Sequence, residues 1–522
     1  MNRPHMGYHR ECSVDACVVG KVTDPTVYAT KHSNVTKPPC DGTCSRIEPA
    51  QVPILNILQR GGIPIIQASL SHDALKVDII EYQTGMEYIA ISHVWSDGLG
   101  NETHSWLPKC QFVHLIQAVE ATRKADDESA VAPTENDSGT ITVRFWIDTI
   151  CVPRGDANLE FRWKALDLMA DTYRHSSMVL VLDAELYQTK PETSLQAIML
   201  LNCSNWMRRL WTLQEGILGG QRLYILFKGR TLHLWSELEK LRQQQRTEPW
   251  RCDPLIPFIL RTGLQTSIRA SPSDKLSWLF RDMNWRSTTR KTDEALVLST
   301  LLNVIPPNMN QIPAEDRLMA VIAELDEFPR RVIFAPGPRF EKEGYGWALR
   351  SFLRRTDFSL GTSFAKLQKI RDQHSGAKVL GLKLSYPGYI LRRTLELNRR
   401  PWDFVLLDSQ HDKVLHIKEV VSRQEFVEEV EGNDDGGPAV MLGLIIHKPV
   451  FNRIHAYGAV VGLDAESSAE LSAAAGFLGV HHGSVDVFIY ARGENLAIEE
   501  RGKDGVELAY NYSDTEKTWI IQ

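Results

Sequence analysis

The chain has 522 residues, which is too long for a single hydrophobic core and predicts two or three domains. Its net charge of −6 at pH 7 argues against nucleic-acid binding, which needs a basic surface. The sequence has no stretch of ~18 uninterrupted apolar residues for a membrane helix and no secretory signal, so we expect a cytoplasmic protein without membrane contact.

The first 50 residues show no regular periodicity but contain half of the cysteines. Without a secretory signal, these cysteines are expected to be reduced thiols. Their spacings, x4 and x3, are wider than the C-x2-C knuckles typical of structural zinc sites. We therefore predict an irregular extension over 1–50 with scattered thiols and no metal, although a zinc site is the alternative. Its ligands would come from Cys12, Cys17, Cys40 and Cys44, with His5, His9 and His32 nearby.

Short apolar runs begin after residue 50 and alternate with helical patterns. The runs are nearly continuous in apolar, β-branched and aromatic residues, which is typical of strands buried on both faces of a parallel sheet. They lie at 88–94, 145–148, 178–183 and 222–227. Their alternation with helices predicts right-handed βαβ units, and hence a doubly wound, flavodoxin-like parallel sheet.

Helical patterns fill the spaces between the later runs, at 158–175, 194–203 and 205–218. Apolar residues recur there at three- and four-residue steps. Ser204 is a suitable N-cap for the last helix, and Gly219-Gly220 would end it.

The pattern changes beyond residue 230. Segments such as WSELEKLRQQQ and DEALVLSTLL predict helices, whereas alternating runs bounded by turn residues predict strands nearer the C-terminus. We therefore predict an N-terminal extension, an α/β domain, a mainly helical region and a β-rich C-terminal region. These span 1–50, 51–230, 231–375 and 376–522.

Polar side chains follow the predicted strands. In a doubly wound sheet, ligands bind at the carboxyl ends of the strands, where the strand order reverses. We therefore expect a polar binding site there and predict that Ser92, Asp148 and Glu215 converge at this edge. The binding residues that we predict are Ser92, His93, Trp95, Asp97, Asp148, Arg154 and Trp211.

Three blocks resemble those of the fungal heterokaryon incompatibility (HET) domain, in the expected order: AISHVWSDGLGN (90–101), FWIDTICVP (145–153) and MRRLWTLQE (207–215). The resemblance covers about 85–220. It implies a protein of non-self recognition, a form of innate immunity, whose HET domain triggers growth arrest or programmed cell death. It also implies protein partners or self-association.

HET domains in turn look like relatives of the TIR fold. Ser92 and Asp97 are similar to the S-Y-x-x-x-D opening of TIR domains, and Asp148 and Arg154 to their second strand and the loop after it. Ser204, Trp211 and Glu215 resemble the S…W-C-x-x-E helix, although Thr212 stands where the cysteine follows the tryptophan. That helix carries the catalytic glutamate of TIR enzymes that cleave NAD.

This second resemblance implies a TIR-like NAD glycohydrolase with Glu215 as the catalytic residue, NAD as substrate and no required cofactor. A carboxylate would stabilise the oxocarbenium-like ribose, while Trp95 or Trp211 would stack on a ring. In the alternative, Glu215 caps the helix or pairs with Arg208 or Arg209, and both tryptophans are core residues. The domain would then be a non-enzymatic module that signals by self-association.

Overall fold

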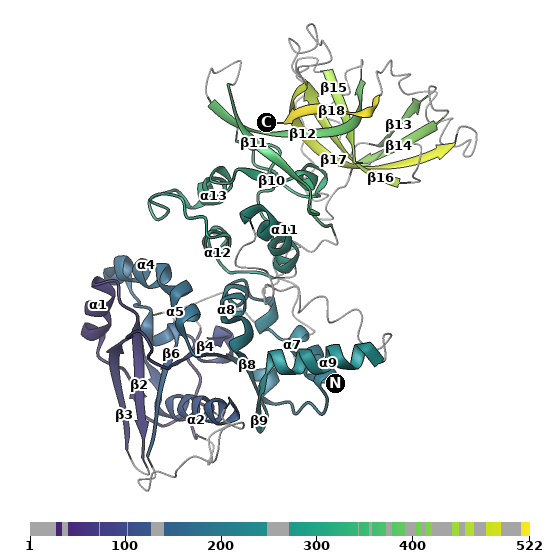
Figure 1. Cartoon of the computed structure of the whole chain (residues 1–522). Helices are drawn as coiled ribbons and strands as arrows, with labels where there is room; N and C mark the ends of the chain where they lie inside the picture. Colours follow the sequence, from purple (N-terminus) through teal and green to yellow (C-terminus); the bar gives the residue numbers. More distant parts are fainter. Residues whose placement is uncertain are drawn as a thin grey trace. The chain divides into compact units, whose positions relative to one another are not determined.

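The computed structural model of the chain forms two compact units that interleave in sequence (Figure 1). Unit 1 comprises Met1–Arg269 and Trp285–Leu301, and unit 2 comprises Ala270–Asn284 and Leu302–Gln522. The exchange of segments lies inside the region predicted to be helical. The structure describes residues 28–33, 40–71, 74–101, 103–126, 140–247, 271–284, 286–342, 344–353, 358–371, 378–391, 403–408, 413–419, 441–447, 455–463, 477–491 and 513–521.

Unit 1 is built on a seven-stranded sheet with the order β3-β2-β6-β4-β7-β8-β9. The strands are β2 (Pro64–Leu70), β3 (Leu75–Glu81), β4 (Ile89–His93), β6 (Ile141–Trp146), β7 (Met178–Leu182), β8 (Leu223–Phe227) and β9 (Arg230–His233). The four central strands, β6, β4, β7 and β8, are mutually parallel. The outer strands pair antiparallel with their neighbours. The predicted α/β class is confirmed, and the four predicted strands are parallel neighbours, but the sheet is mixed because antiparallel strands extend it at both edges.

The antiparallel edges have a physical cause. A central parallel strand must be covered on both faces, and β4 and β8 are buried along their whole length. An antiparallel edge strand tolerates solvent, and β3 is mostly half-buried. Its sequence therefore lacks the continuous apolar run by which the central strands were predicted.

The strand order places the first parallel strand of the chain, β4, in the middle of the sheet. From β4 the chain passes to β6 on one side and then crosses to β7 on the other. The connections that leave β4 and β7 therefore diverge, and a crevice forms between the carboxyl ends of these two strands.

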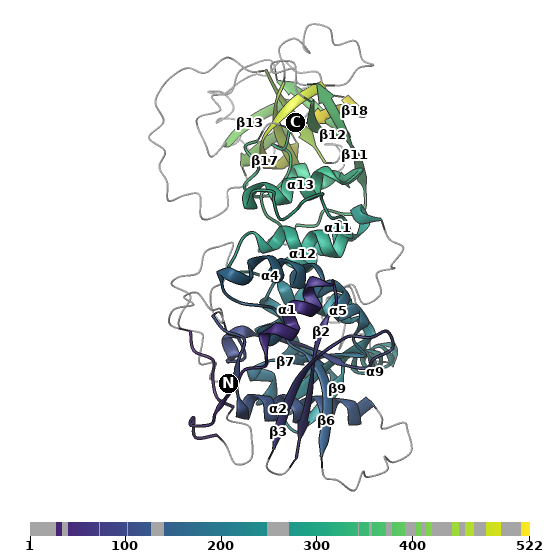
Figure 2. The ribbon, with the colours of Figure 1, turned by 90° about the vertical axis from the view of Figure 1, so that its left-hand side faces the viewer.

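Helices cover both faces of this sheet (Figures 1 and 2). On one face, the Tyr173 hydroxyl donates to the Ile91 carbonyl oxygen at 3.1 Å, which seats α5 against β4. α2 packs on the other face. The helices of unit 1 include α1 (Gln51–Gln59), α2 (Lys109–Asp126), α3 (Asp148–Cys151), α4 (Leu159–Asp167), α5 (Met169–His175), α6 (Ala184–Tyr187), α7 (Ser194–Cys203), α8 (Trp211–Gly219) and α9 (Leu234–Thr247).

The helix predicted over 205–218 is interrupted, and that prediction is wrong. A 3₁₀ turn, η5 (Trp206–Arg208), precedes α8, and Arg209 between them is extended. The break occurs because the Ser287 backbone N–H donates to the Arg208 carbonyl oxygen at 2.8 Å, while Leu210 N–H donates to the Ser287 carbonyl at 3.1 Å. The Ser204 hydroxyl accepts from Met207 N–H, so it caps η5 and not α8.

Unit 2 combines short helices with a second sheet. In α11 (Pro272–Met283), the Ser271 hydroxyl accepts from Asp274 N–H at 3.1 Å, and Pro272 needs no hydrogen-bond acceptor in the first turn. α12 (Asp293–Leu302) lies almost wholly in the unit 1 segment, and α13 (Arg317–Ala323) follows in unit 2. Among the described residues, no helix is long and apolar enough to cross a membrane.

The sheet of unit 2 has nine described strands in the order β10-β11-β12-β15-β16-β17-β14-β13, with β18 beside β12 and β17. Two of them, β10 and β11, precede residue 376. The strands are β10 (Glu327–Pro329), β11 (Phe364–Arg371), β12 (Lys378–Leu391), β13 (Asp403–Asp408), β14 (Lys413–Glu419), β15 (Met441–Ile446), β16 (His455–Leu463), β17 (Phe477–Ala491) and β18 (Ser513–Ile521).

Candidate functional site

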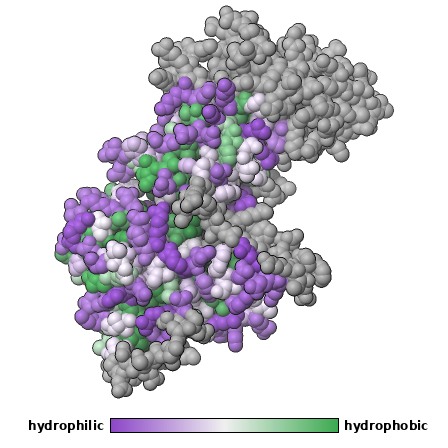
Figure 3. Space-filling view, in the orientation of Figure 1, coloured by the Kyte–Doolittle hydropathy of each residue, from purple (hydrophilic) through white to green (hydrophobic). Residues whose placement is uncertain are grey.

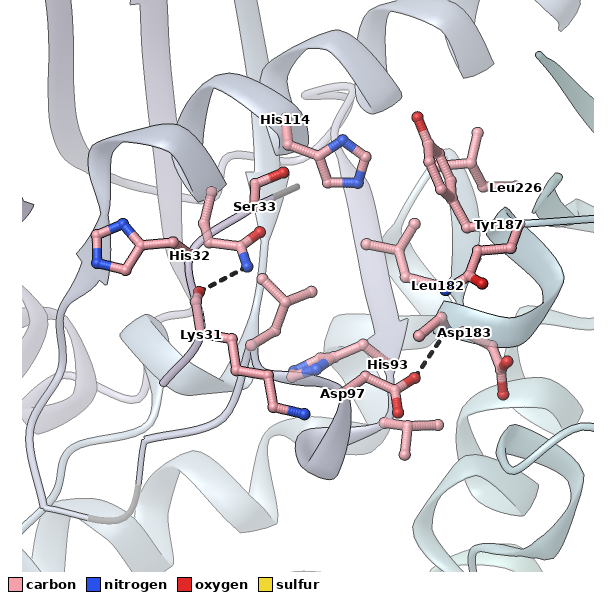
Figure 4. A pocket seen from close by; sticks show the side chains of 15 residues that line it. Lys31, His32, Ser33, His93, Asp97, His114, Leu182, Asp183, Tyr187 and Leu226 are labelled. Atoms are coloured by element: carbon pink, nitrogen blue, oxygen red, sulfur yellow. Dashed lines mark hydrogen bonds between the residues drawn. The ribbon is translucent and has the colours of Figure 1, made fainter. Parts of the chain in front are cut away.

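A cavity of about 370 Å³ lies at the crevice between β4 and β7 (Figure 4). Its size is within the range of small-molecule sites. His93 and Asp97 reach it from the end of β4, Asp183 from the end of β7 and His114 from α2. The segment 31–33, close to the N-terminus, completes the wall.

The N-terminal segment is held at the cavity by the loop after β4. Lys31 N–H donates to the Gly98 carbonyl oxygen at 3.0 Å, and the Thr30 hydroxyl donates to the Gly100 carbonyl at 2.8 Å. Gly98 has a φ of +116°, and a Cβ atom there would lie 2.5 Å from Lys31 Cβ. This position therefore requires glycine, both for its backbone conformation and for the close approach of the segment.

Two carboxylates face the cavity, the half-buried Asp97 and the buried Asp183. Asp97 accepts a hydrogen bond from Ala184 N–H at 2.8 Å, and Asp183 caps α6 by accepting from Glu185 N–H at 3.0 Å. Burial, together with the nearby charge of Asp183, raises the pKa of Asp97 to about 6. Burial also raises the pKa of Asp183. Both groups are hydrogen-bond acceptors and, when protonated, also donors, at the floor of a small-molecule cavity.

Asp148 is the centre of a second polar network. Its two carboxylate oxygens contact His93 Nε2 and Trp95 Nε1, each at 2.7 Å. The Arg154 guanidinium lies 4.4 Å from the centre of the Trp95 ring and 4.0 Å from an Asp148 oxygen. Burial opposes ionisation of Asp148, but His93, Arg154 and the Trp95 hydrogen bond outweigh it and hold its pKa well below the usual range.

Glu215 is buried on α8 and accepts a hydrogen bond from the Ser92 hydroxyl at the end of β4. Ser92 in turn accepts from Trp206 Nε1 at 2.6 Å. Burial is the main cause that raises the pKa of Glu215 to about 7, and the charge of Asp148 contributes to this rise. The Ser92 hydrogen bond and the charges of His93 and Arg209 act in the opposite direction. Glu215 is therefore buried against Ser92, and among the described residues it forms no ion pair with Arg208 or Arg209.

The structure brings most of the predicted site residues together. Ser92 meets Glu215, while His93, Trp95, Asp148 and Arg154 share one network and Asp97 lines the cavity. Trp211 takes no part in these hydrogen bonds; its Nε1 donates to Asp293 at 2.9 Å.

Trp206, which donates to Ser92, is a residue of the candidate site that the sequence did not reveal. The ring fits against α8 because Gly216 leaves room for it; a Cβ atom there would lie 3.0 Å from the ring. Both tryptophans stand in the same NWMRRLW segment, and the break at Arg209 determines which one faces Ser92. Nothing in the segment's periodicity indicates that break.

The raised pKa of Glu215 predicts a pH-dependent stability. The folded protein binds this proton more tightly than the unfolded chain, whose glutamate has its ordinary pKa of 4.5. This stabilisation is therefore present below pH 4.5 and lost as the pH rises through about 7. The raised pKa of Asp97 also stabilises the folded protein at low pH, and this contribution is lost as the pH rises through about 6.

We accordingly expect the melting temperature to fall between about pH 5 and about pH 8, and Glu215→Gln to reduce this slope. Differential scanning fluorimetry across the range measures it. Glu185→Gln, which removes an exposed carboxylate, is the matched control and should leave the slope unchanged. Equal slopes in the wild type and Glu215→Gln would contradict the assignment.

Comparison with known proteins bears on the part of unit 1 that carries the cavity. The family model described as "Heterokaryon incompatibility protein (HET)" matches residues 88–196. No curated protein and no solved structure matches the chain. The matched segment begins at β4 and ends within α7, so it includes Ser92, His93 and Asp148 but not Glu215. The chain therefore carries a heterokaryon incompatibility (HET) domain over residues 88–196.

Proposed function

We propose that unit 1, with its HET domain, binds NAD in the cavity and cleaves the bond between nicotinamide and ribose through Glu215. The loss of NAD would then cause the cell death of incompatibility. One observation carries this proposal: the Glu215 carboxyl group is buried at the carboxyl edge of the sheet and is held by Ser92, next to His93, which lines the cavity from the other face of β4. The nicotinamide ribose of NAD bound in the cavity would therefore extend past the end of β4 toward Ser92.

The cavity offers the groups that a dinucleotide requires. Asp97 and Asp183 are acceptors for ribose hydroxyls, and Lys31 adds a cationic side chain for phosphate. His93 is 6% exposed, and its Nδ1 atom has no hydrogen-bond partner among the described residues. A buried polar atom without a partner costs stability, so a ligand that bonds to it gains affinity.

Glu215 suits the chemical step. In this reaction the N-glycosidic bond breaks, and its electron pair leaves with nicotinamide, which becomes neutral and needs no general acid. The ribose passes through an oxocarbenium-like state that an ionised carboxylate stabilises. Water then adds its hydroxyl group to the ribose and its proton goes to solvent. With a pKa of about 7, Glu215 is ionised in part of the molecules at neutral pH.

A second function, self-association without catalysis, is favoured by a different observation. Consecutive residues of a strand point to opposite faces, so Ser92 with Glu215 lies on the face opposite His93 and the cavity. Trp206, Ser92 and Glu215 also satisfy one another's hydrogen bonds, so this chain of hydrogen bonds does not need a ligand.

The surface of unit 1 offers a candidate for self-association. Hydrophilic residues predominate on the described surface drawn in Figure 3. Val52 of α1 and Leu159 of α4 are nevertheless 66% and 55% exposed, on neighbouring helices.

Release of nicotinamide from NAD by the purified full chain, with and without a fused dimeriser, separates these functions. Catalysis predicts release, and Ala184→Phe should weaken NAD binding at least about tenfold by filling the cavity that Ala184 lines. Ala74→Phe adds the same bulk at an exposed site and is the control. If clustered protein releases no nicotinamide, the catalytic proposal fails. If Ala184→Phe binds NAD normally, the cavity is not the site.

A further inference from the structure

Four potential metal ligands from separate parts of the sequence meet at the start of α2. They are His32, Cys40, Cys44 and Cys110, and their ligand atoms all lie within 4.8 Å of one another. Three of them belong to the N-terminal extension. The fourth, Cys110, is a buried residue in the first turn of α2 and has no place in a motif with the others. Cys12, Cys17, His5 and His9 lie outside the described residues.

The distances fit one tetrahedral ion. His32 Nδ1 lies 3.4 Å from the Cys40 sulfur, 3.3 Å from Cys44 and 3.6 Å from Cys110. Bonds of about 2.3 Å to sulfur and about 2.0 Å to nitrogen at tetrahedral angles place neighbouring N and S ligands about 3.5 Å apart. Three thiolates and one imidazole are a ligand set that zinc prefers.

Secondary structure explains why two of these cysteines meet. β1 (Arg46–Ile47) pairs antiparallel with β5 (Leu107–Pro108), with Arg46 opposite Pro108. Lys109 N–H continues the ladder by donating to the Ser45 carbonyl oxygen at 2.8 Å. Cys44 and Cys110 each lie two residues beyond the Arg46–Pro108 pair, so this pairing brings them close together.

Backbone amides orient two of the sulfurs. Ser33 N–H donates to the Cys110 sulfur at 3.1 Å, and Gly42 N–H donates to the Cys40 sulfur at 3.4 Å. Donors of this kind favour the thiolate and fix the direction of the ligand, as the outer shell of a metal site does. Gly42 has a φ of +90°, which lets the chain turn back from Cys40 toward Cys44.

We propose that His32, Cys40, Cys44 and Cys110 bind one zinc ion. All four positions around the metal are occupied by protein atoms, so the site is structural and not catalytic. His32 also lines the cavity, between Lys31 and Ser33. The zinc therefore fixes the N-terminal segment to α2 and, with it, one wall of the cavity.

Metal analysis of the full-length protein, purified without chelators, tests this proposal. Elemental mass spectrometry should find about one zinc ion per chain, in keeping with a single four-ligand site. Zinc should fall to background in Cys40→Ser/Cys44→Ser, which changes partly exposed positions. A strong chelator should lower the melting temperature of the wild type, because metal binding is coupled to folding.

Two control variants distinguish this site from others. Cys203→Ser changes an exposed cysteine outside the cluster, and Cys12→Ser/Cys17→Ser removes the other N-terminal thiols; both should retain the zinc. Cobalt(II) loaded in place of zinc should give the visible spectrum of a tetrahedral thiolate site, which keeps the test valid if a variant misfolds. Wild-type protein with no zinc, with iron, or with a Cys40–Cys44 disulfide would overturn the proposal. So would loss of zinc in Cys12→Ser/Cys17→Ser.

Discussion

Glu215→Gln should lower the rate of nicotinamide release from NAD by about 10²–10³-fold, with little change in NAD binding. The substitution keeps the size of the side chain and an oxygen that can accept from the Ser92 hydroxyl. It removes only the negative charge that would stabilise the oxocarbenium-like ribose. Single-turnover kinetics, with NAD affinity measured separately by calorimetry, separates the loss of rate from a loss of binding.

The stability of the Glu215→Gln protein shows whether a lower rate comes from the lost charge or from unfolding. Because burial opposes the charge of Glu215, the neutral glutamine should leave the protein at least as stable near neutral pH. Glu185→Gln again serves as the exposed control. A variant that keeps its fold and still cleaves NAD at the wild-type rate would remove Glu215 from the mechanism. A variant that unfolds would show that the Trp206–Ser92–Glu215 chain of hydrogen bonds is structural.

The central strands were predictable because a strand that is buried on both faces has an almost continuous run of apolar residues. β7 and β8 are continuous apolar runs, and β4 is apolar up to its last two residues, Ser92 and His93. The edge strand β3 and its neighbour β2 were not predicted; β3 is mostly half-buried and has no continuous apolar run, and the polar residues Gln67 and Ser69 interrupt the run of β2. Their pairing is also antiparallel, which no pattern of alternating strands and helices indicates.

Only those residues of the candidate site that lie at the ends of predicted strands could be predicted from the sequence. Ser92, His93 and Asp148 follow buried strands, so their convergence is expected from the topology alone. Trp206 and Cys110 reach their positions through a backbone bridge to Ser287 and through the pairing of β1 with β5. Such long-range hydrogen bonds have no local pattern in the sequence, and therefore these two residues became visible only in the structure.

Asp148→Ala should destabilise the protein by about 2–3 kcal/mol, the upper part of the range for charge-assisted hydrogen bonds. The variant leaves Trp95 Nε1 and His93 Nε2 without the acceptor that each now contacts at 2.7 Å. The side chain of Asp148 is 25% exposed, so water replaces part of what is lost and the cost stays below that of a fully buried pair. Urea denaturation followed by tryptophan fluorescence measures the change.

One further variant separates the hydrogen bonds of Asp148 from its charge, and a second serves as an exposed control. Asp148→Asn keeps one acceptor oxygen for Trp95, and its amide can donate to His93, so about half of the lost stability should return. Asp171→Ala breaks an exposed pair with Arg174, whose side chains are 47% and 42% exposed, and should cost less than about 1 kcal/mol. If Asp148→Ala cost no more than Asp171→Ala, the network would not hold the strand ends. The geometry of the cavity would then have to come from the N-terminal segment and its proposed zinc.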